Sequence, residues 1–300
     1  MKGKKYSIAS IIALIMMVAL ASLMSIAGCE GKREKGGTIQ IKGSDTEVNL
    51  AQRLAESFME KHPEVSISVT GGGSGTGIAA LINRRTDIAN SSREMKPEEI
   101  DSARQKGINP MATIFARDGI VLIVHQDNPV RSLTLEEAGK IFKGEVTLWN
   151  IFAGLDMEVS LYGRQSNSGT YIYFRDRVLK GDYSPQMKMM NGNAQIVEGV
   201  KRDRGGIGYV GIAYVVRDGQ VVEGIRVLGI IQDPGGEAIS PLDTGKMVQG
   251  NYRLFRPLYQ YTDGAPQGII AEFIRFELSP EGQKLIAQEG FYPNEVNIEK

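Results

Sequence analysis

The chain has 300 residues, 42% of them hydrophobic and 23% charged, which is typical of a globular protein large enough to build its core without disulfides. Lysine plus arginine and aspartate plus glutamate both number 35, so the chain has no positive excess with which to neutralise a nucleic-acid backbone, and we expect no nucleic-acid partner. Two histidines and one cysteine are too few for the usual zinc site or for an internal disulfide, and we expect neither a metal nor another cofactor.

The N-terminus resembles a bacterial secretion signal. The basic start KGKK precedes an uncharged, mostly apolar run over 8–26, which is long enough to cross a bilayer, so an uncleaved anchor is the alternative. The letters IAGC that end at Cys29 resemble a lipobox, which implies cleavage before this cysteine and a lipid on it. We therefore predict a signal peptide over 1–28 and a lipidated polar tether over 29–37 that holds the protein outside the cytoplasm, on the cell membrane.

After the tether, short apolar runs alternate with amphipathic helical stretches. Leu50, Leu54 and Phe58 recur with helical spacing, and Pro97 stands at a favoured first helical position. Strands that alternate with helices predict the α/β class with parallel sheets covered on both faces, and the length favours two lobes over one. The predicted strands are 38–41, 65–69, 87–90 and 120–124, the other predicted helices are 78–82, 97–105, 267–277 and 280–288, and the alternation continues at 159–162, 171–179, 207–210 and 252–261.

Polar turns rich in glycine, serine and threonine follow several predicted strands. GSDT at 43–46, GGGSGTG at 71–77 and RQSNSGT at 164–170 each lie between a strand and a helix, and NSS at 90–92 follows a strand. The carboxyl edge of a parallel sheet is where α/β proteins bind ligands. Helix N-termini and hydroxyls suit an anion, and glycine permits close approach of the backbone. Each serine or threonine alone could be an ordinary helix N-cap, but four clusters with one arginine, Arg164, together predict an oxyanion site.

Motifs of phosphate-handling and hydrolytic enzymes do not fit these turns. No lysine follows Gly77 as a P-loop requires, and the glycines of 71–77 do not have the GxGxxG spacing of a dinucleotide-binding turn. Ser74 is followed by Gly75 and Thr76, so it does not form a GxSxG nucleophile elbow. Because no residue stands ready to activate a serine, the pattern favours binding over catalysis.

The pattern as a whole resembles the phosphate-binding lipoproteins of Pst-type ABC importers, in the periplasmic binding-protein superfamily. The resemblance implies a two-lobed, hinge-linked α/β fold of type II, with lobe 1 over 38–120 and 256–300 and lobe 2 over 121–255. It also implies a monomer without enzymatic activity that captures inorganic phosphate between the lobes and passes it to membrane permease subunits. The segments that carry it are TIQIKGSDTEVNLAQ, VTGGGSGTGIAALI, DIANSSREMKPEEI, DGIVLIVHQDNPV, VTLWN, LYGRQSNSGTY, GIGYVGIAY, RPLYQYT and LSPEGQKLI.

The same resemblance assigns the residues of the site. Lobe 1 is expected to supply hydroxyls and backbone N–H groups from three turns, and lobe 2 to supply the RxxxSGT motif that begins at Arg164. The predicted phosphate ligands are Ser44, Asp45, Thr46, Ser74, Gly75, Ser91, Ser92, Asp118, Arg164, Ser168, Gly169 and Thr170.

The chain departs from some relatives at the acids of the site. These relatives carry an aspartate where 91–92 stands here and another acid where 165–166 stands here. Asp45 and Asp118 are the candidate substitutes that could accept the proton of phosphate, although Asp45 could be a helix N-cap and Asp118 a hinge-turn residue. Binding proteins for sulfate, molybdate, tungstate or a phosphonate stay open as alternatives, as do a secreted phosphate-ester enzyme and a surface adhesin.

Overall fold

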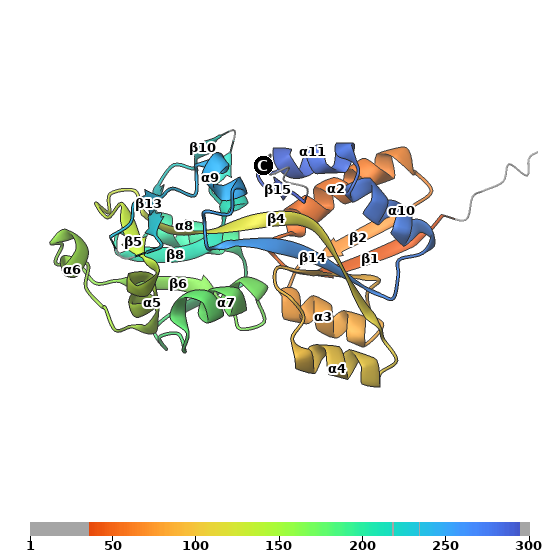
Figure 1. Ribbon diagram of the computed structural model, residues 1–300, viewed down its shortest axis with the longest axis horizontal. Helices are drawn as coiled ribbons and strands as arrows, with labels where there is room; N and C mark the ends of the chain where they lie inside the picture. The colour runs from red at the N-terminus through yellow and green to blue at the C-terminus, as the bar shows by residue number, and fades with distance from the viewer. Residues whose placement is uncertain (1–35, 218, 234, 295–300) are drawn as a thin grey trace, which may run out of the picture. The chain divides into compact units, whose positions relative to one another are not determined.

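A computed structural model describes residues 36–217, 219–233 and 235–294 of the chain (Figure 1). The predicted signal peptide and most of the predicted tether, including Cys29, lie outside the described residues. The chain from Thr38 onward packs as one compact unit. Within the described ranges, no helix combines the length and the apolar composition that a bilayer crossing requires.

One half of the main sheet consists of parallel strands β1, β2 and β3, and we call it the β1 half. Ile39 and Ile41 of β1 point to the face where α2, α10 and α11 pack, whereas Ala89 of β3 points to the face of α3 and α4. The β1 half comprises β1 (Thr38–Gly43), α2 (Val48–Lys61), β2 (Ser66–Thr70), α3 (Ser74–Ile82), β3 (Ile88–Ser91), α4 (Pro97–Gln105), α10 (Gly268–Glu277) and α11 (Pro280–Gln288).

The other half of the sheet, the β6 half, contains the parallel strands β8, β6 and β7. Its core includes aromatic side chains such as Phe142, Phe174 and Tyr209, with Phe174 stacked on Tyr209 at 4.3 Å between ring centroids. The elements of this half are β5 (Ser132–Thr134), α5 (Leu135–Lys143), α6 (Asn150–Ala153), β6 (Ser160–Arg164), α7 (Gly169–Phe174), the π-helical turn η1 (Arg175–Leu179), β7 (Lys188–Met190), α8 (Asn193–Lys201), β8 (Gly206–Gly211), η2 (Ile212–Tyr214), β9 (Val216–Arg217), β10 (Gln220–Val221), β11 (Ile225–Val227), β12 (Gly229–Ile231), β13 (Ala238–Ile239) and α9 (Thr244–Val248).

Two long strands, β4 (Pro110–His125) and β14 (Phe255–Asp263), run side by side between the halves (Figure 1). The two strands are antiparallel to each other. In addition, β14 is antiparallel to β3, and β4 is antiparallel to β8. The expectation of purely parallel sheets is therefore wrong at the centre, because the chain crosses between the halves in both directions. The predicted strand 120–124 is the last part of β4, which starts at Pro110. The short β15 (Tyr292–Pro293) pairs with β4.

The hydrophobic core is divided at these crossings. One buried cluster takes its residues from 120–254, together with Tyr292. Two others take theirs from 39–116 and 258–291. Gly119 and Phe255 face each other in the β4–β14 ladder, where the clusters meet along the chain.

Candidate functional site

Polar turns follow the ends of the parallel strands β1, β2 and β3. Gly43, the last residue of β1, has a φ of 145°, and a Cβ there would lie 2.0 Å from the carbonyl oxygen of Asn90. Glycine is therefore required where the GSDT turn leaves the sheet. Gly73 has a φ of 92° directly before α3, so that Ser74 becomes the first residue of this helix, four residues earlier than predicted. Parallel pairing places these turns at one edge of the sheet.

The four serines of these turns do not play the same part. Ser44, directly after β1, is buried, and its N–H donates to the Asn90 carbonyl oxygen at 2.9 Å. Ser74 and Ser92 are buried, the Ser74 hydroxyl accepts a hydrogen bond from the Ser92 N–H at 3.1 Å, and the two hydroxyls lie 3.3 Å apart. The Ser91 hydroxyl instead donates to the carbonyl oxygen of Arg93 at 2.7 Å. Ser74 and Ser92 thus face one another, whereas the side chain of Ser91 stabilises its own turn.

The first residues of α7, from the β6 half, lie against these hydroxyls. A Cβ at Gly169 would be 2.3 Å from the Ser74 hydroxyl oxygen and 2.6 Å from that of Ser92. Glycine is therefore needed here for close approach rather than for an unusual φ. Ser168 is the N-cap of α7, and its hydroxyl accepts from the Tyr171 N–H at 3.4 Å.

Two further contacts join the same turns. The hydroxyls of Thr46 and Thr170 lie 2.9 Å apart, both fully buried. The Gly75 N–H donates to the Asn167 carbonyl oxygen at 2.9 Å, and the Asn167 amide donates to the Gly72 carbonyl oxygen at 2.8 Å. Turns far apart in the sequence therefore meet with their polar groups facing one another.

Arg164 ends β6 and is 1% exposed. Its Nη2 donates to Asp45 Oδ2 at 2.5 Å and to the Asn191 carbonyl oxygen at 2.8 Å. Among the described residues, its Nε and Nη1 have no hydrogen-bond partner. Burial lowers the pKa of Arg164 and nearby Asp45 opposes this shift, yet an arginine keeps its charge at physiological pH. Two N–H directions of a buried cation are thus available to an acceptor.

A second buried arginine, Arg256, faces Asp118 directly across the β4–β14 ladder. Its Nε and Nη2 donate to Asp118 Oδ2 at 3.2 and 2.9 Å, and its Nη1 donates to the Ser92 carbonyl oxygen at 3.0 Å. Nη2 also donates to the Thr170 hydroxyl at 2.9 Å. Burial raises the pKa of the Asp118 carboxyl, and the Arg256 guanidinium opposes that shift. Arg256 therefore joins strand β14 to residues of both halves.

We call the residues that these contacts connect the hydroxyl–arginine cluster. The cluster contains two aspartates, Asp45 and Asp118. Both carboxylate oxygens of Asp45 accept hydrogen bonds, whereas Asp118 Oδ1 has no hydrogen-bond partner in the described part of the chain. Ten of the twelve predicted ligands are buried, and Asp45 and Gly75 are partly exposed. The cluster consists of Asp45, Thr46, Ser74, Gly75, Ser92, Asp118, Arg164, Asn167, Gly169, Thr170 and Arg256.

The sequence reasoning missed three residues of this region. Arg256 stands only within RPLYQYT, Asn167 only within RQSNSGT and Tyr214 only within GIGYVGIAY, none with a role of its own. The Tyr214 hydroxyl donates to the Asp45 carbonyl oxygen at 2.5 Å. An arginine at the start of an apolar strand was the available signal for Arg256. Its partner, however, depends on the register between strands far apart in the sequence.

A separate group of buried polar side chains consists of Glu47, Asn90, Gln260 and Glu277, and we call it the acid cluster. Glu47 directly precedes α2. Asn90 of β3 and Gln260 of β14 are register partners, and Gln260 Nε2 donates to Glu277 Oε1 at 3.1 Å. Burial raises the pKa of Glu47 and of Glu277 well above the usual value. For Glu47, Ser44 and Arg256 oppose this shift, and Asp118 and Glu277 add to it less strongly. Six side-chain atoms of Glu47, Asn90, Gln260 and Glu277 are buried without a partner among the described residues.

Neither polar group has the donor set of a metal centre. In the part of the chain that the structure covers, no three histidine, cysteine, aspartate or glutamate side chains gather so that they could hold a metal ion. The hydroxyl–arginine cluster instead offers N–H and O–H donors, which suit an anion.

Comparison with known proteins places the chain among solute-binding proteins. Residues 30–281 match the family model described as the PBP superfamily domain. The phosphate-binding protein PstS of Pseudomonas aeruginosa is 32% identical over 276 residues, which are 86% of this chain and 83% of that protein. Protein SphX of Synechococcus elongatus is 31% identical over 294 residues, 93% of this chain and 84% of that protein.

Solved structures agree with these relatives. One from Clostridium perfringens, named as a phosphate ABC transporter substrate-binding protein with bound phosphate, has a TM-score of 0.74 at 28% identity and covers 85% of this chain and 99% of that one. An ABC-type phosphate transport receptor from Vibrio cholerae has a TM-score of 0.68 at 26% identity, with 85% and 99% covered.

Proposed function

Because the chain belongs to the PBP superfamily and, within it, to the family of the phosphate-binding protein PstS, we propose that it captures inorganic phosphate between two lobes and delivers it to an ABC importer. The observation that carries this proposal is Arg164, a buried cation whose Nε and Nη1 have no partner among the described residues, in a cluster with hydroxyls from both halves. Its relatives are named as binding and transport proteins. We propose that this chain likewise binds without catalysing a reaction.

The proposed ligands of phosphate are the donors of the hydroxyl–arginine cluster. The hydroxyls of Thr46, Ser74 and Ser92 come from the β1 half, and Thr170 and Arg164 come from the β6 half. Each charge-assisted hydrogen bond to the anion contributes about 1.5–3 kcal/mol. Ser44, Ser168 and the N–H group of Gly169 complete the proposed set, with Ser91 acting through its turn and Gly75 through its N–H bond to the Asn167 carbonyl oxygen.

Asp118 is the proposed acceptor for the proton of phosphate. Of the two candidate aspartates, Asp45 has both carboxylate oxygens engaged, whereas Asp118 Oδ1 has no partner within the described residues. Phosphate can donate a proton to this oxygen and sulfate cannot. A carboxylate oxygen that faces a sulfate oxygen stays unsatisfied, which costs about 1–3 kcal/mol or more for a charged group. The site is therefore proposed to prefer phosphate over sulfate.

The proposed lobes are 38–120 with 256–300 and 121–255, and they move about the β4–β14 crossing. The division of the hydrophobic core near Gly119 and Phe255 supports this boundary. Since the donors come from both lobes, only the closed arrangement completes the set, and phosphate favours closure by its preference for that state. The permease is proposed to recognise the closed protein, which acts as a monomer.

We also propose that Cys29 carries lipid and anchors the protein outside the cytoplasm. The IAGC letters that end at Cys29 support this assignment, and the family match begins one residue later, at 30. Metabolic labelling with radioactive palmitate should label the wild-type chain, and Cys29→Ser should abolish the label.

Titration calorimetry with phosphate, sulfate and molybdate tests the proposed function directly. We expect saturable binding of one phosphate per chain and weaker binding of the other anions by at least about tenfold. If sulfate or molybdate binds more tightly than phosphate, that anion is the ligand in place of phosphate. If none of the three anions binds, the proposed function is wrong.

A further inference from the structure

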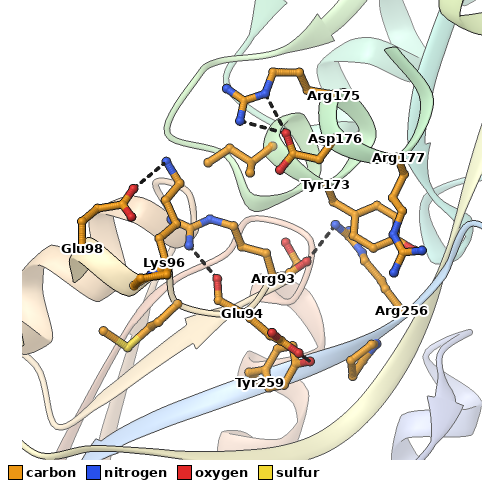
Figure 2. Close-up of a pocket in the computed structure, with 15 residues that line it drawn as sticks. Arg93, Glu94, Lys96, Glu98, Tyr173, Arg175, Asp176, Arg177, Arg256 and Tyr259 are labelled. Carbon is orange, nitrogen blue, oxygen red and sulfur yellow. Dashed lines mark hydrogen bonds and ion pairs between the residues drawn. The ribbon is translucent and has the colours of Figure 1, made fainter. Parts of the chain in front are cut away.

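A pocket of about 550 Å³ opens beside the hydroxyl–arginine cluster. Its walls are the segment 92–98 from the β1 half, the segment 172–177 from the β6 half, and 256–259 of β14 (Figure 2). Ser92 and Arg256, both 1% exposed, belong to the cluster and also line this pocket. The pocket therefore connects solvent with residues that are otherwise buried.

The wall of the pocket carries charges of both signs. Five arginine and lysine side chains and three carboxylates line it, and the carboxylates of Glu99 and Asp118, which pair with two of these cations, balance the remaining charge. Several of the cations are already paired: Arg93 with Glu99 at 2.7 Å, Arg175 with Asp176 at 2.9 Å, and Arg256 with Asp118 at 2.9 Å. Arg177 is exposed and, among the described residues, forms no ion pair. Arg177 is thus the cation of this wall whose charge no carboxylate within the described residues neutralises.

Tyr173 lies between this exposed arginine and the buried one (Figure 2). The guanidinium carbon of Arg177 is 5.7 Å from the centre of the Tyr173 ring, and that of Arg256 is 5.4 Å from it. The Tyr173 hydroxyl donates to the Phe255 carbonyl oxygen at 3.2 Å, which fixes the ring against the start of β14. Cation–π contacts with one ring hold both guanidinium groups in place.

We propose that this pocket is the route by which the anion reaches the buried site, and that Arg177 is the cation that attracts it at the entrance. This inference rests on the proposed function. An anion drawn to Arg177 would pass along Tyr173 toward Arg256 and Ser92, which form the inner end of the pocket. An exposed positive charge at the entrance of a pocket raises the association rate of an anion and makes that rate depend on salt.

The test measures rates rather than affinity alone. The dissociation rate is obtained by rapid filtration after dilution of bound radiolabelled phosphate into unlabelled phosphate, and the association rate is that rate divided by the calorimetric Kd. The variants are Arg177→Ala, Arg177→Lys, which keeps the charge, and Arg202→Ala, which removes an equally exposed charge outside the pocket. Salt is raised from about 20 mM to about 500 mM, which shortens the Debye length from about 20 Å to about 4 Å.

We expect Arg177→Ala to slow association by about 3- to 10-fold at low salt and to leave the dissociation rate within about twofold. Arg177→Lys and Arg202→Ala should stay close to wild type, and the defect should shrink at high salt. An unchanged association rate in Arg177→Ala, or an equal loss in Arg202→Ala, would overturn the route while leaving the proposed function intact. A wild-type chain that binds no phosphate would overturn both.

Discussion

The hydroxyl–arginine cluster is mostly buried and the acid cluster is buried. The two adjoin at Thr46 and Glu47, yet they differ in how their polar atoms are paired. In the first, hydroxyls and guanidinium groups from the two halves bond one another, and each aspartate has an arginine partner. In the second, six buried atoms lack partners in the described part of the chain, and burial raises the pKa of both carboxyls. The first is suited to hold a charged ligand, whereas burial of the second favours the uncharged form of its carboxyls.

Removing the buried cation should have the largest effect on the first region. Arg164→Ala is expected to weaken phosphate binding by more than about 2 kcal/mol, because charge-assisted hydrogen bonds are lost and Asp45 is left unpaired. Titration calorimetry measures the change, with Arg202→Ala as an exposed control. An unchanged Kd in Arg164→Ala would remove this arginine from the site.

Adding a methyl group at the start of α7 should have the next largest effect on phosphate binding. Gly169→Ala would place a Cβ 2.3 Å from the Ser74 hydroxyl oxygen, so we expect the two halves to be held apart and binding to weaken by about 1–3 kcal/mol. Gly192→Ala is the control, since Gly192 also lies at the start of a helix, as the N-cap of α8, and nothing lies within 4 Å of its added Cβ. Calorimetry and thermal unfolding should show lost affinity with little lost stability. Equal affinities of the two variants would contradict the close approach.

Asp118 Oδ1, which has no hydrogen-bond partner among the described residues, should control anion selectivity. Asp118→Asn is expected to narrow the ratio of the sulfate and phosphate Kd values by about tenfold, because an amide can donate to sulfate. Asp45→Asn should weaken both anions alike, since its oxygens bond Gly72 and Arg164. Competition calorimetry gives the ratio, and circular dichroism checks that each variant folds. If Asp45→Asn changes the ratio and Asp118→Asn does not, Asp45 is the acceptor instead.

The acid cluster should make stability depend on pH. The pKa of Glu277 is higher in the folded protein than in the unfolded chain. Above about pH 4.3 the unfolded chain therefore releases a proton that the folded protein keeps. Between this pH and the folded pKa, the free energy of unfolding falls as pH rises, by at most about 1.4 kcal/mol per pH unit. Glu277→Gln should remove the share of this loss that Glu277 contributes and exceed wild type by about 1 kcal/mol at pH 8. Urea unfolding from about pH 5 to about pH 8 measures it.

Exposed Glu60 of α2 provides the control for this titration. Glu60→Gln should leave the pH slope of the wild type unchanged, and Glu47→Gln should act like Glu277→Gln. A slope that is the same in Glu277→Gln and in wild type would mean that Glu277 is ionised in the folded protein.

The order of elements in the β1 half could be predicted closely from the sequence. Helix α4 begins at Pro97 and ends at Gln105 as predicted, and β1, β2 and β3 lie within two residues of the predicted ranges. The two-lobed periplasmic-binding-protein fold is confirmed by the family match and the solved relatives. The purely parallel sheet was wrong, because β4 and β14 read as short apolar runs whose direction depends on the crossings between the halves.

Local periodicity and turn chemistry determined which residues of this chain form strands, helices and polar turns, because these depend on neighbours a few positions away. Only the tertiary structure decided that Arg256 meets Asp118, that Gly169 lies against Ser74, and that Glu47 is buried while its neighbour Thr46 faces Thr170. These contacts depend on the register of strands and the packing of helices that are 95 to 138 residues apart in the sequence. No local pattern encodes that register, since it is set by burial across the whole core.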